Sequence, residues 1–283
     1  MSGPSRAPRT VRAVEEVGPA CFRIAVEFPE PPSAVEPGQF FMLRRADGQG
    51  PLLPRPFSLE RLGDGLASFL AKVIGPGTRA LAALRPGEGL VLTGPLGRGF
   101  PPVRPDDGAV LLAGGIGIAP FPHVVERARA AGVSPRALTL VFGAASGDQH
   151  YALPLFESYG IRIVLATDDG SRGFRGNALA AYEAEVEARR IDARAPVFAC
   201  GPERMLEAVA RRAREKDRRA HVSLETFMAC GVGICNGCAV PVEPGAFDGW
   251  PYAKACREGP VFDARLLRGE KGSGTVSADG NGA

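Results

Sequence analysis

LETFMACGVGICNGCAVPVEPGAFDGWPYAKACREGPVF, residues 224–262, is the stretch around which the rest of the chain is organised. It holds Cys230, Cys235 and Cys238, spaced C-x4-C-x2-C, and Cys256 follows eighteen positions after the third cysteine. Three thiolates within nine residues, with a fourth arriving from a distance, form the ligand pattern of plant-type [2Fe–2S] centres. The spacing therefore predicts an iron–sulfur cluster with these four cysteines as its ligands.

Glycines separate the cysteines, at Gly231, Gly233 and Gly237. A loop around a cluster must turn its backbone amides toward the sulfurs, and side chains at these positions would obstruct the wrapping. Two alternatives remain open. A four-cysteine zinc site usually has two CxxC pairs, and only Cys235–Cys238 has that spacing. Disulfides would suit a secreted chain, but no segment that directs secretion is evident.

The composition is typical of a globular protein in a reducing compartment. The 283 residues are 45% apolar and 23% charged, which allows two compact domains and a small appendage. A net charge of +3 is too small to indicate a nucleic-acid or membrane-surface partner. No membrane span or signal peptide is evident, and four of the six cysteines belong to the expected cluster. We therefore expect a cytoplasmic protein.

Residues 1–104 are expected to form a small antiparallel β-barrel, because short strand-like runs alternate there with Gly and Pro clusters. RPFS (Arg55–Ser58) offers a guanidinium and a hydroxyl to a pyrophosphate or ribityl chain. GPGT (75–78) leads into a helical segment, whose N-terminal N–H groups could bind a phosphate. Taken alone, RPFS also fits a turn with a surface arginine.

Residues 105–218 alternate strands with helices, which predicts a doubly wound parallel sheet with its ligand at the carboxyl ends of the strands. GGIGIAP (114–120) follows the first strand directly and opens a helix at Pro120. It places Gly114, Gly115 and Gly117 where a pyrophosphate needs close backbone approach, although the spacing departs from G-x-G-x-x-G.

ACGPERM (199–205) follows the last of these strands. It places Cys200, Gly201 and Pro202 at the mouth of the expected crevice, so we expect Cys200 to lie near the reacting ring of a bound nucleotide.

Asp168 follows the strand-like run IRIVLAT, where an acid often holds a ribose hydroxyl and so favours NAD over NADP. Arg172 and Arg175 lie close in sequence and keep NADP open. An ordinary turn with Gly170 is the alternative for this carboxylate.

The remaining residues divide into a cluster segment and a tail. Residues 219–265 carry the four cysteines, and residues 266–283 have too few apolar side chains to pack, so we expect a disordered tail. The expected fold class is multi-domain β plus α/β: an antiparallel β-barrel, a doubly wound parallel sheet and a small C-terminal [2Fe–2S] segment.

The order of these parts resembles the ferredoxin–NADP reductase superfamily, in which a barrel with RPFS precedes a nucleotide fold with GGIGIAP and CGP. Within that superfamily, SLETFMACGVGICNGCAV and KACREGPVF resemble the electron-transfer subunits of the heteromeric, NAD-linked dihydroorotate dehydrogenases of bacteria. The resemblance covers residues 10–265 and implies FAD, a [2Fe–2S] cluster and NAD(H) as cofactors. The four cysteines match the cluster ligands of this family.

The resemblance also implies FAD contacts from a strand edge, a second strand and a turn: Arg55, Pro56, Phe57, Ser58, Leu70, Ala71, Lys72, Gly77 and Thr78. The NAD contacts expected from the motifs are Gly114, Gly115, Gly117, Pro120, Asp168, Gly201 and Pro202. Family members often have an aromatic residue and an arginine where this chain has Ala71 and Lys72, a departure that affects ring stacking.

The implied function is electron transfer in de novo pyrimidine (UMP) biosynthesis. Dihydroorotate would be oxidised on a separate FMN-containing catalytic subunit, and electrons would pass through the cluster and FAD to NAD+. Two such heterodimers would form a heterotetramer. The alternatives are a reductase subunit of a ferredoxin–NADP oxidoreductase or hydrogenase complex, an oxygenase reductase with a fused ferredoxin, and a non-enzymatic redox sensor.

Overall fold

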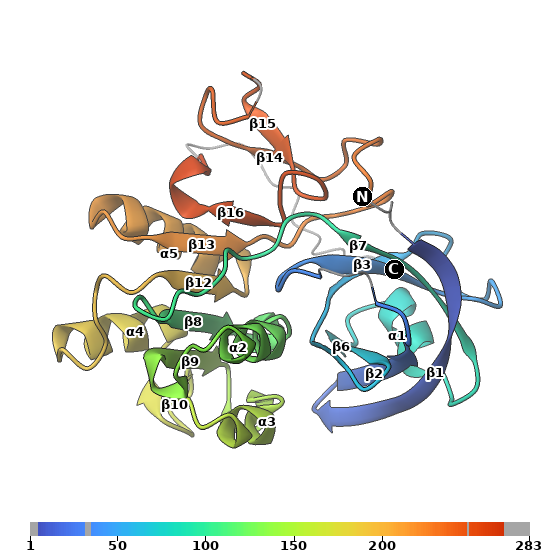
Figure 1. Cartoon of the computed structure of the whole chain (residues 1–283), viewed down its shortest axis with the longest axis horizontal. Helices are drawn as coiled ribbons and strands as arrows, with labels where there is room; N and C mark the ends of the chain where they lie inside the picture. The colour runs from blue at the N-terminus through green and yellow to red at the C-terminus, as the bar shows by residue number, and fades with distance from the viewer. Residues whose placement is uncertain (1–4, 32–34, 248, 269–283) are drawn as a thin grey trace, which may run out of the picture.

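Two seven-stranded sheets lie side by side, and a short hairpin sits above their junction (Figure 1). The computed structural model describes residues 5–31, 35–247 and 249–268. Most of the predicted tail, residues 269–283, therefore lies outside the described residues.

The first sheet is antiparallel, with the strand order β4-β3-β7-β1-β2-β6-β5. Its elements are β1 (Ser5–Gly18), β2 (Cys21–Glu27), β3 (Phe40–Arg45), β4 (Arg55–Ser58), β5 (Arg61–Gly63), β6 (Leu66–Lys72), helix α1 (Pro76–Ala82) and β7 (Gly89–Leu96). Buried and part-buried residues alternate along β7, so one face of the strand packs inward. The sheet curls until β4 contacts β6, and Phe41 and Phe69 pack edge to face inside it.

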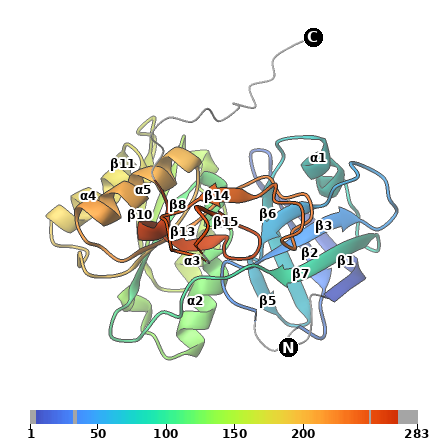
Figure 2. The same ribbon diagram turned by 90° about the horizontal axis from the view of Figure 1, so that it is seen from above.

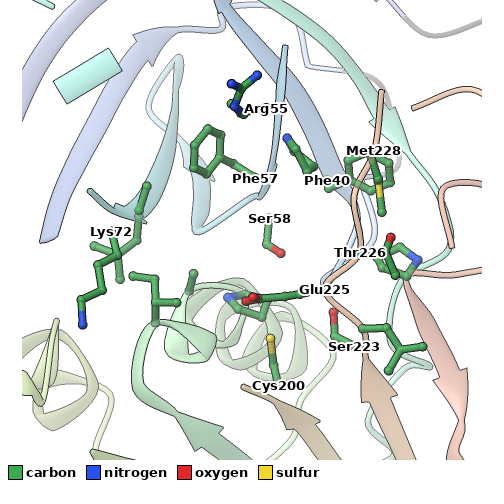
Figure 3. A pocket seen from close by; sticks show the side chains of 18 of the residues that line it. Phe40, Arg55, Phe57, Ser58, Lys72, Cys200, Ser223, Glu225, Thr226 and Met228 are labelled. Carbon is green, nitrogen blue, oxygen red and sulfur yellow. The ribbon is translucent and has the colours of Figure 1, made fainter. Parts of the chain in front are cut away.

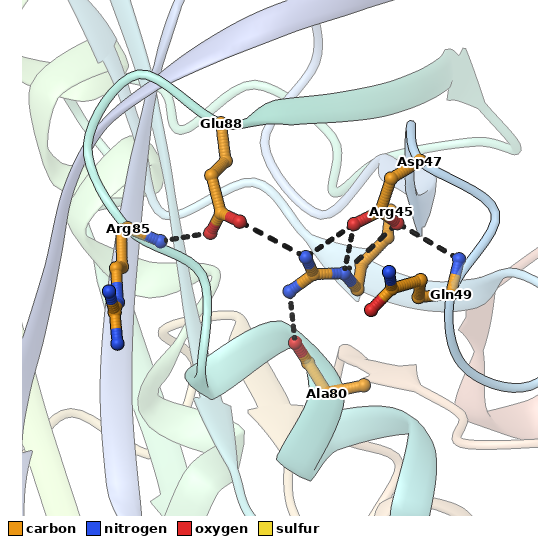
Figure 4. A network of polar contacts seen from close by, with 6 residues as sticks. All are labelled: Arg45, Asp47, Gln49, Ala80, Arg85 and Glu88. Atoms are coloured by element: carbon orange, nitrogen blue, oxygen red, sulfur yellow. Dashed lines mark hydrogen bonds and ion pairs between the residues drawn. The ribbon is translucent and has the colours of Figure 1, made fainter.

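Helix α1 is held against this sheet by a polar network around Arg45, the last residue of β3 (Figure 4). Its guanidinium donates to Ala80 O at 3.3 Å and to Glu88 Oε1 at 3.2 Å. The other Glu88 carboxylate oxygen accepts from the Arg85 N–H at 2.6 Å, which ties the loop after α1 to the same arginine. The network therefore fixes the position of α1 beside β3.

The second sheet has the order β11-β10-β9-β8-β12-β13-β16, and only β16 is antiparallel. Its elements are β8 (Ala109–Gly114), α2 (Phe121–Ala130), β9 (Leu138–Ala144), α3 (Leu153–Ser158), β10 (Arg162–Thr167), β11 (Phe174–Arg175), α4 (Ala178–Glu187), β12 (Val197–Cys200), α5 (Glu203–Glu215), β13 (Ala220–Ser223) and β16 (Val261–Asp263), with 3₁₀ turns at Gly115–Ile118, Pro135–Ala137, Gly147–Gln149 and Ala264–Leu266.

Helices cover both faces of this sheet, with α4 and α5 on one side and α2 on the other (Figure 2). The buried strand β8 shows the same division, because its alternate residues join different cores. Val110 and Leu112 pack with residues of α4 and α5, whereas Leu111 packs with residues of α2 and α3. The expected fold class, a β domain followed by a doubly wound α/β domain, is confirmed.

The cluster segment does not stand apart from the second sheet. Strand β13 pairs in parallel with β12, and β16 pairs with β13. Between them, β14 (Ala239–Pro241) and β15 (Tyr252–Lys254) form an antiparallel hairpin. The division expected after residue 218 therefore falls within one sheet, between α5 and β13, and the domain boundaries remain a prediction.

Direct contacts join the two sheets on the side of α2 and α3. Arg61 Nε donates to Glu126 Oε1 at 2.6 Å, and the Tyr159 hydroxyl donates to the same oxygen at 2.8 Å. The Tyr151 hydroxyl donates to Pro19 O at 3.3 Å, and its ring lies against Gly18. These contacts set the spacing across the junction where the main cavity lies.

Among the described residues, no helix has the length and apolar character needed to cross a membrane.

Candidate functional site

A cavity of about 490 Å³ lies between the two sheets (Figure 3). Both halves of the fold line it: β4, β6 and the start of α1 from the barrel, and the turn after β8 and the ends of β12 and β13 from the second sheet. Of the nine residues expected to contact FAD, eight line it: Arg55, Pro56, Phe57, Ser58, Leu70, Ala71, Lys72 and Thr78. Its size and mostly apolar lining suit a ring system with a few fixed polar contacts.

Gly77 is the expected FAD residue that does not line the cavity, and it lies directly beneath Arg55. A Cβ at this position would be 2.6 Å from Arg55 Nε, so the guanidinium can lie across the start of α1 only over a glycine. The Arg55 side chain also donates to Leu53 O at 2.6 Å, which holds it at the cavity edge.

The turn before α1 offers fewer free amides than expected. The Thr78 hydroxyl accepts hydrogen bonds from the N–H groups of Ile74 at 3.0 Å and Gly75 at 3.2 Å. Two of the backbone donors near the start of this helix are therefore already paired. The positive charge of Arg55 adds to what could attract a phosphate here.

The glycines of GGIGIAP and CGP are brought together, and they pack against protein backbone. A Cβ at Gly117 would overlap Cys200 O, and a Cβ at Gly201 would be 3.0 Å from Gly114 Cα. Glycine is therefore needed for the contact between the turn after β8 and the end of β12. Gly115, in contrast, has a positive φ of 53° and open space beside it. The role of these glycines in binding a pyrophosphate remains a prediction.

Cys200 and Pro120 line the cavity, whereas Asp168 does not. The Cys200 thiol is buried, and burial raises its pKa, so the sulfur stays protonated at neutral pH. Asp168 follows β10, two strands from β8 at the same edge of the sheet. The structure therefore brings Cys200 to the candidate ring site and leaves Asp168 where only a more distant part of a nucleotide could reach it.

One wall of the cavity was not predicted from the sequence: residues 223–228, which continue from β13 toward the first cluster cysteine. All six line the cavity: Ser223, Leu224, Glu225, Thr226, Phe227 and Met228. Phe40, Ile74, Ile116, Ala119 and Pro260 also line it without having been expected. The segment was assigned to the cluster alone, because its proximity to Cys230 in sequence gave no sign that it also contacts the barrel side.

Glu225 is the only acidic side chain among the cavity-lining residues. Figure 3 shows it in the same part of the cavity as Ser58 and Cys200. The residue as a whole is exposed, but neighbouring atoms desolvate the Glu225 carboxyl and raise its pKa, which makes the protonated form more accessible than for a fully hydrated glutamate. A carboxyl, a thiol and a hydroxyl thus gather in one part of the site, where a proton could be held or moved.

The Thr226 hydroxyl is a buried polar group that bears on whether these residues fit a flavin. Its Oγ1 is shielded from solvent and has no hydrogen-bond partner among the described residues. A buried unpaired hydroxyl is unfavourable, so a ligand with a polar ring atom would satisfy it. Together with the apolar walls and the Arg55 guanidinium, this hydroxyl makes the cavity suitable for a flavin nucleotide.

We expect Thr226→Val to weaken FAD binding by about 2- to 10-fold, the effect of losing one hydrogen bond of about 0.5–1.5 kcal/mol. The measurement is the dissociation constant of FAD, by fluorescence titration of the flavin-depleted chain. Thr226→Ser, which keeps the hydroxyl, should stay within twofold of the unmodified chain. Equal affinities for Thr226→Val and the unmodified chain would exclude this contact.

The cluster loop takes left-handed backbone conformations at three positions. Gly231 has a φ of 71°, Gly233 a φ of 83° and Asn236 a φ of 58°. A Cβ at Gly231 would also be 2.7 Å from Met42 Cγ, so the loop packs closely on β3. At Gly237, a Cβ would make an ordinary contact, 3.6 Å from a thiol sulfur, and the expected steric need for glycine there is not found.

The four thiols lie near one another, because Cys230 is affected by Cys235, and Cys256 by both Cys238 and Cys230. Burial alone would raise the pKa of Cys230, but backbone N–H groups and the Cys235 side chain lower it to about 6. Burial, followed by the adjacent Cys238 thiol, raises the pKa of Cys256 to about 12. Cys238 and Cys256 are buried, whereas Cys235 is exposed. Two neighbouring buried thiols favour a bound cation that would neutralise their thiolates.

The donor set bears on the zinc alternative. Within residues 5–31, 35–247 and 249–268, no three His, Cys, Asp or Glu side chains converge so that they could hold one metal ion. Four thiols with a single CxxC pair suit a centre with two irons, each bound by two thiolates, better than they suit a single tetrahedral zinc. The donor set therefore fits a [2Fe–2S] cluster.

Two family profiles match the chain. Residues 225–268 match the iron–sulfur cluster binding domain of dihydroorotate dehydrogenase B, and residues 111–211 match the oxidoreductase NAD-binding domain. The first profile spans all four cysteines, and the second spans the GGIGIAP and CGP motifs.

Similar proteins extend over most of the chain. The dihydroorotate dehydrogenase B (NAD(+)) electron transfer subunit of Desulforamulus reducens is 35% identical, covering 89% of this chain and 94% of its own length. The subunit of the same name from Clostridium acetobutylicum is 34% identical, covering 81% and 84%. A solved NADH-dependent reduced ferredoxin–NADP oxidoreductase has a TM-score of 0.79 at 24% identity, covering 93% of this chain and 90% of its own, which shows a shared fold.

Proposed function

Since this chain belongs to the family of dihydroorotate dehydrogenase B electron-transfer subunits, we propose that it carries electrons from a partner subunit to NAD+ in pyrimidine biosynthesis. The cofactors are FAD, a [2Fe–2S] cluster and NAD(H). The observation that carries the proposal is the position of residues 223–228. This one segment lines the flavin-sized cavity and then leads directly into the cluster loop at Cys230, so the two cofactor sites adjoin.

The chemistry requires both groups because, when bound, the cluster exchanges single electrons while the flavin can exchange either single electrons or a hydride with nicotinamide. The residues of this chain would hold the cofactors in position and shield them from water. Arg55 would hold the flavin pyrophosphate, and the apolar walls would exclude water from the ring. Cys200, buried and protonated, would lie at the face where the nicotinamide docks. Glu225 would hold a proton beside the same face.

We propose that the partner is an FMN-containing catalytic subunit that carries the dihydroorotate site. It would approach the outer side of the cluster loop, where Cys235 is exposed and Ile234 is 79% exposed to solvent. An exposed isoleucine beside a ligand cysteine suits a surface that a partner covers. A heterotetramer of two heterodimers and a location in the cytoplasm, with its nicotinamide pool, are parts of the same proposal.

The test is to tag this chain, isolate it from its native cells with its bound partners, and assay NAD+ reduction driven by dihydroorotate. We expect reduction by the complex, and none by the FMN subunit assayed without this chain. NADP+ serves as the parallel acceptor and should be used poorly. No dihydroorotate-driven reduction, together with rapid NADH oxidation by an artificial acceptor, would support a reductase subunit of another complex.

A further inference from the structure

A cation is hydrogen-bonded to the loop that supplies three of the cluster cysteines. Lys254, at the end of β15, donates from Nζ to Gly233 O at 2.8 Å. Its aliphatic chain also packs on that glycine, since a Cβ there would be 3.9 Å from Lys254 Cδ. The side chain is half-buried, and the Lys254 backbone N–H donates to Glu258 Oε2 at 2.7 Å. The ammonium is therefore held in place at both ends of the residue.

The carbonyl that Lys254 bonds belongs to the peptide between Gly233 and Ile234. In the same loop, the Val232 N–H donates to Cys230 Sγ at 3.4 Å. The loop thus carries an ammonium on one carbonyl and a ligand sulfur on a nearby N–H. A positive charge fixed on this loop acts on the ligand sulfurs in the same sense as the N–H groups of the loop, because both favour added negative charge there.

Positive charge near the ligand sulfurs favours the reduced form of an iron–sulfur cluster. Reduction adds a negative charge, and both hydrogen bonds to the sulfurs and net charge set the potential of such centres. We propose that Lys254 is a positioning residue that raises the reduction potential of the cluster by holding a positive charge at the Gly233 carbonyl of the cluster loop. This inference rests on the proposed function, since it requires the cluster to be bound.

The other charges near Lys254 do not replace it. Arg257 also packs on Gly233, but its side chain is 73% exposed and its Nε lies 3.7 Å from Glu258 Oε1. An exposed charge beside a carboxylate is screened by solvent and partly neutralised. Arg257 therefore provides a matched control: a second cation at the same loop that is not bonded to the peptide.

The test is a redox titration of the cluster in the full chain, followed by electron paramagnetic resonance. At the midpoint potential of the unmodified chain, the ratio of reduced to oxidised cluster is one by definition. In Lys254→Met we expect that ratio to fall about tenfold, which corresponds to 59 mV for a one-electron couple. Lys254→Gln keeps a neutral donor and should fall by less. Lys254→Arg and Arg257→Met should each stay within about twofold.

Iron content, measured on every variant, separates the possible outcomes. An unmodified chain without a [2Fe–2S] signal would contradict the proposed function itself. Unchanged midpoints in Lys254→Met and Lys254→Gln, with the cluster intact, would overturn only the role of Lys254. If both neutral variants lost iron while Lys254→Arg kept it, Lys254 would be a structural clamp and the redox assignment would be wrong. If only Lys254→Met lost iron, the midpoint of Lys254→Gln would decide.

Discussion

Cys256→Ala should lose the visible absorption of the cluster while FAD stays bound. Cys256 is buried beside Cys238 and enters from the turn after β15, so the other three cysteines cannot complete the centre without it. The cavity-lining residues do not include Cys256, and the flavin site should therefore survive. We expect iron and acid-labile sulfide to fall to about a tenth or less of the wild-type content per chain.

Cys21→Ala is the matched control, because it removes a buried cysteine that is not part of the cluster loop. Cys21 lies in β2 of the barrel, and burial raises its pKa to about 12, as expected for an inert core thiol. This variant should keep both iron and FAD. The ligand assignment fails if Cys256→Ala retains wild-type iron and sulfide, or if Cys21→Ala loses as much iron as Cys256→Ala does.

The parts of the site that could be predicted are those whose ligand residues lie close together in the sequence, at a spacing typical of one kind of site. The C-x4-C-x2-C run needs no knowledge of the fold, because the ligands of one loop are close by chain connectivity. RPFS was indicated by its own guanidinium and hydroxyl, whereas the strand of Leu70 was expected only through a family resemblance. The structure places both in the wall of one cavity.

The parts that could not be predicted depend on contacts between distant segments. Gly117 appears in a motif that suggests phosphate binding, yet its closest contact is the backbone of Cys200, more than eighty positions away. Likewise, nothing near Thr226 in the sequence shows that its hydroxyl lies in a cavity shared with Arg55. Strands β13 and β16 are short, and the pairing of β13 with β12 and of β16 with β13 extends the second sheet beyond the region where strands and helices alternate.

The relation between Gly77 and Arg55 gives the second large expected effect. Gly77→Ala places a Cβ 2.6 Å from Arg55 Nε, so the two cannot keep their present positions. The colliding atoms are the far end of a flexible side chain, and alanine suits a helix, so the fold should survive while the guanidinium moves. If Arg55 binds the flavin pyrophosphate, its displacement removes a charge-assisted interaction of about 1.5–3 kcal/mol and weakens FAD binding about 10- to 150-fold.

A double-mutant cycle with Arg55→Met decides whether the two residues act as one unit. Arg55→Met alone should weaken FAD binding by a similar factor, and adding Gly77→Ala to it should change little, because the arginine is already gone. Gly75→Ala is the matched control in the same turn, since a Cβ there meets nothing within 4 Å. Additive losses of FAD affinity would mean that Gly77 acts by another route. Wild-type FAD affinity in Gly77→Ala would contradict the assignment of Arg55 to the phosphate site. The cycle therefore tests, with FAD affinity as its readout, whether this glycine is present to leave room for an arginine.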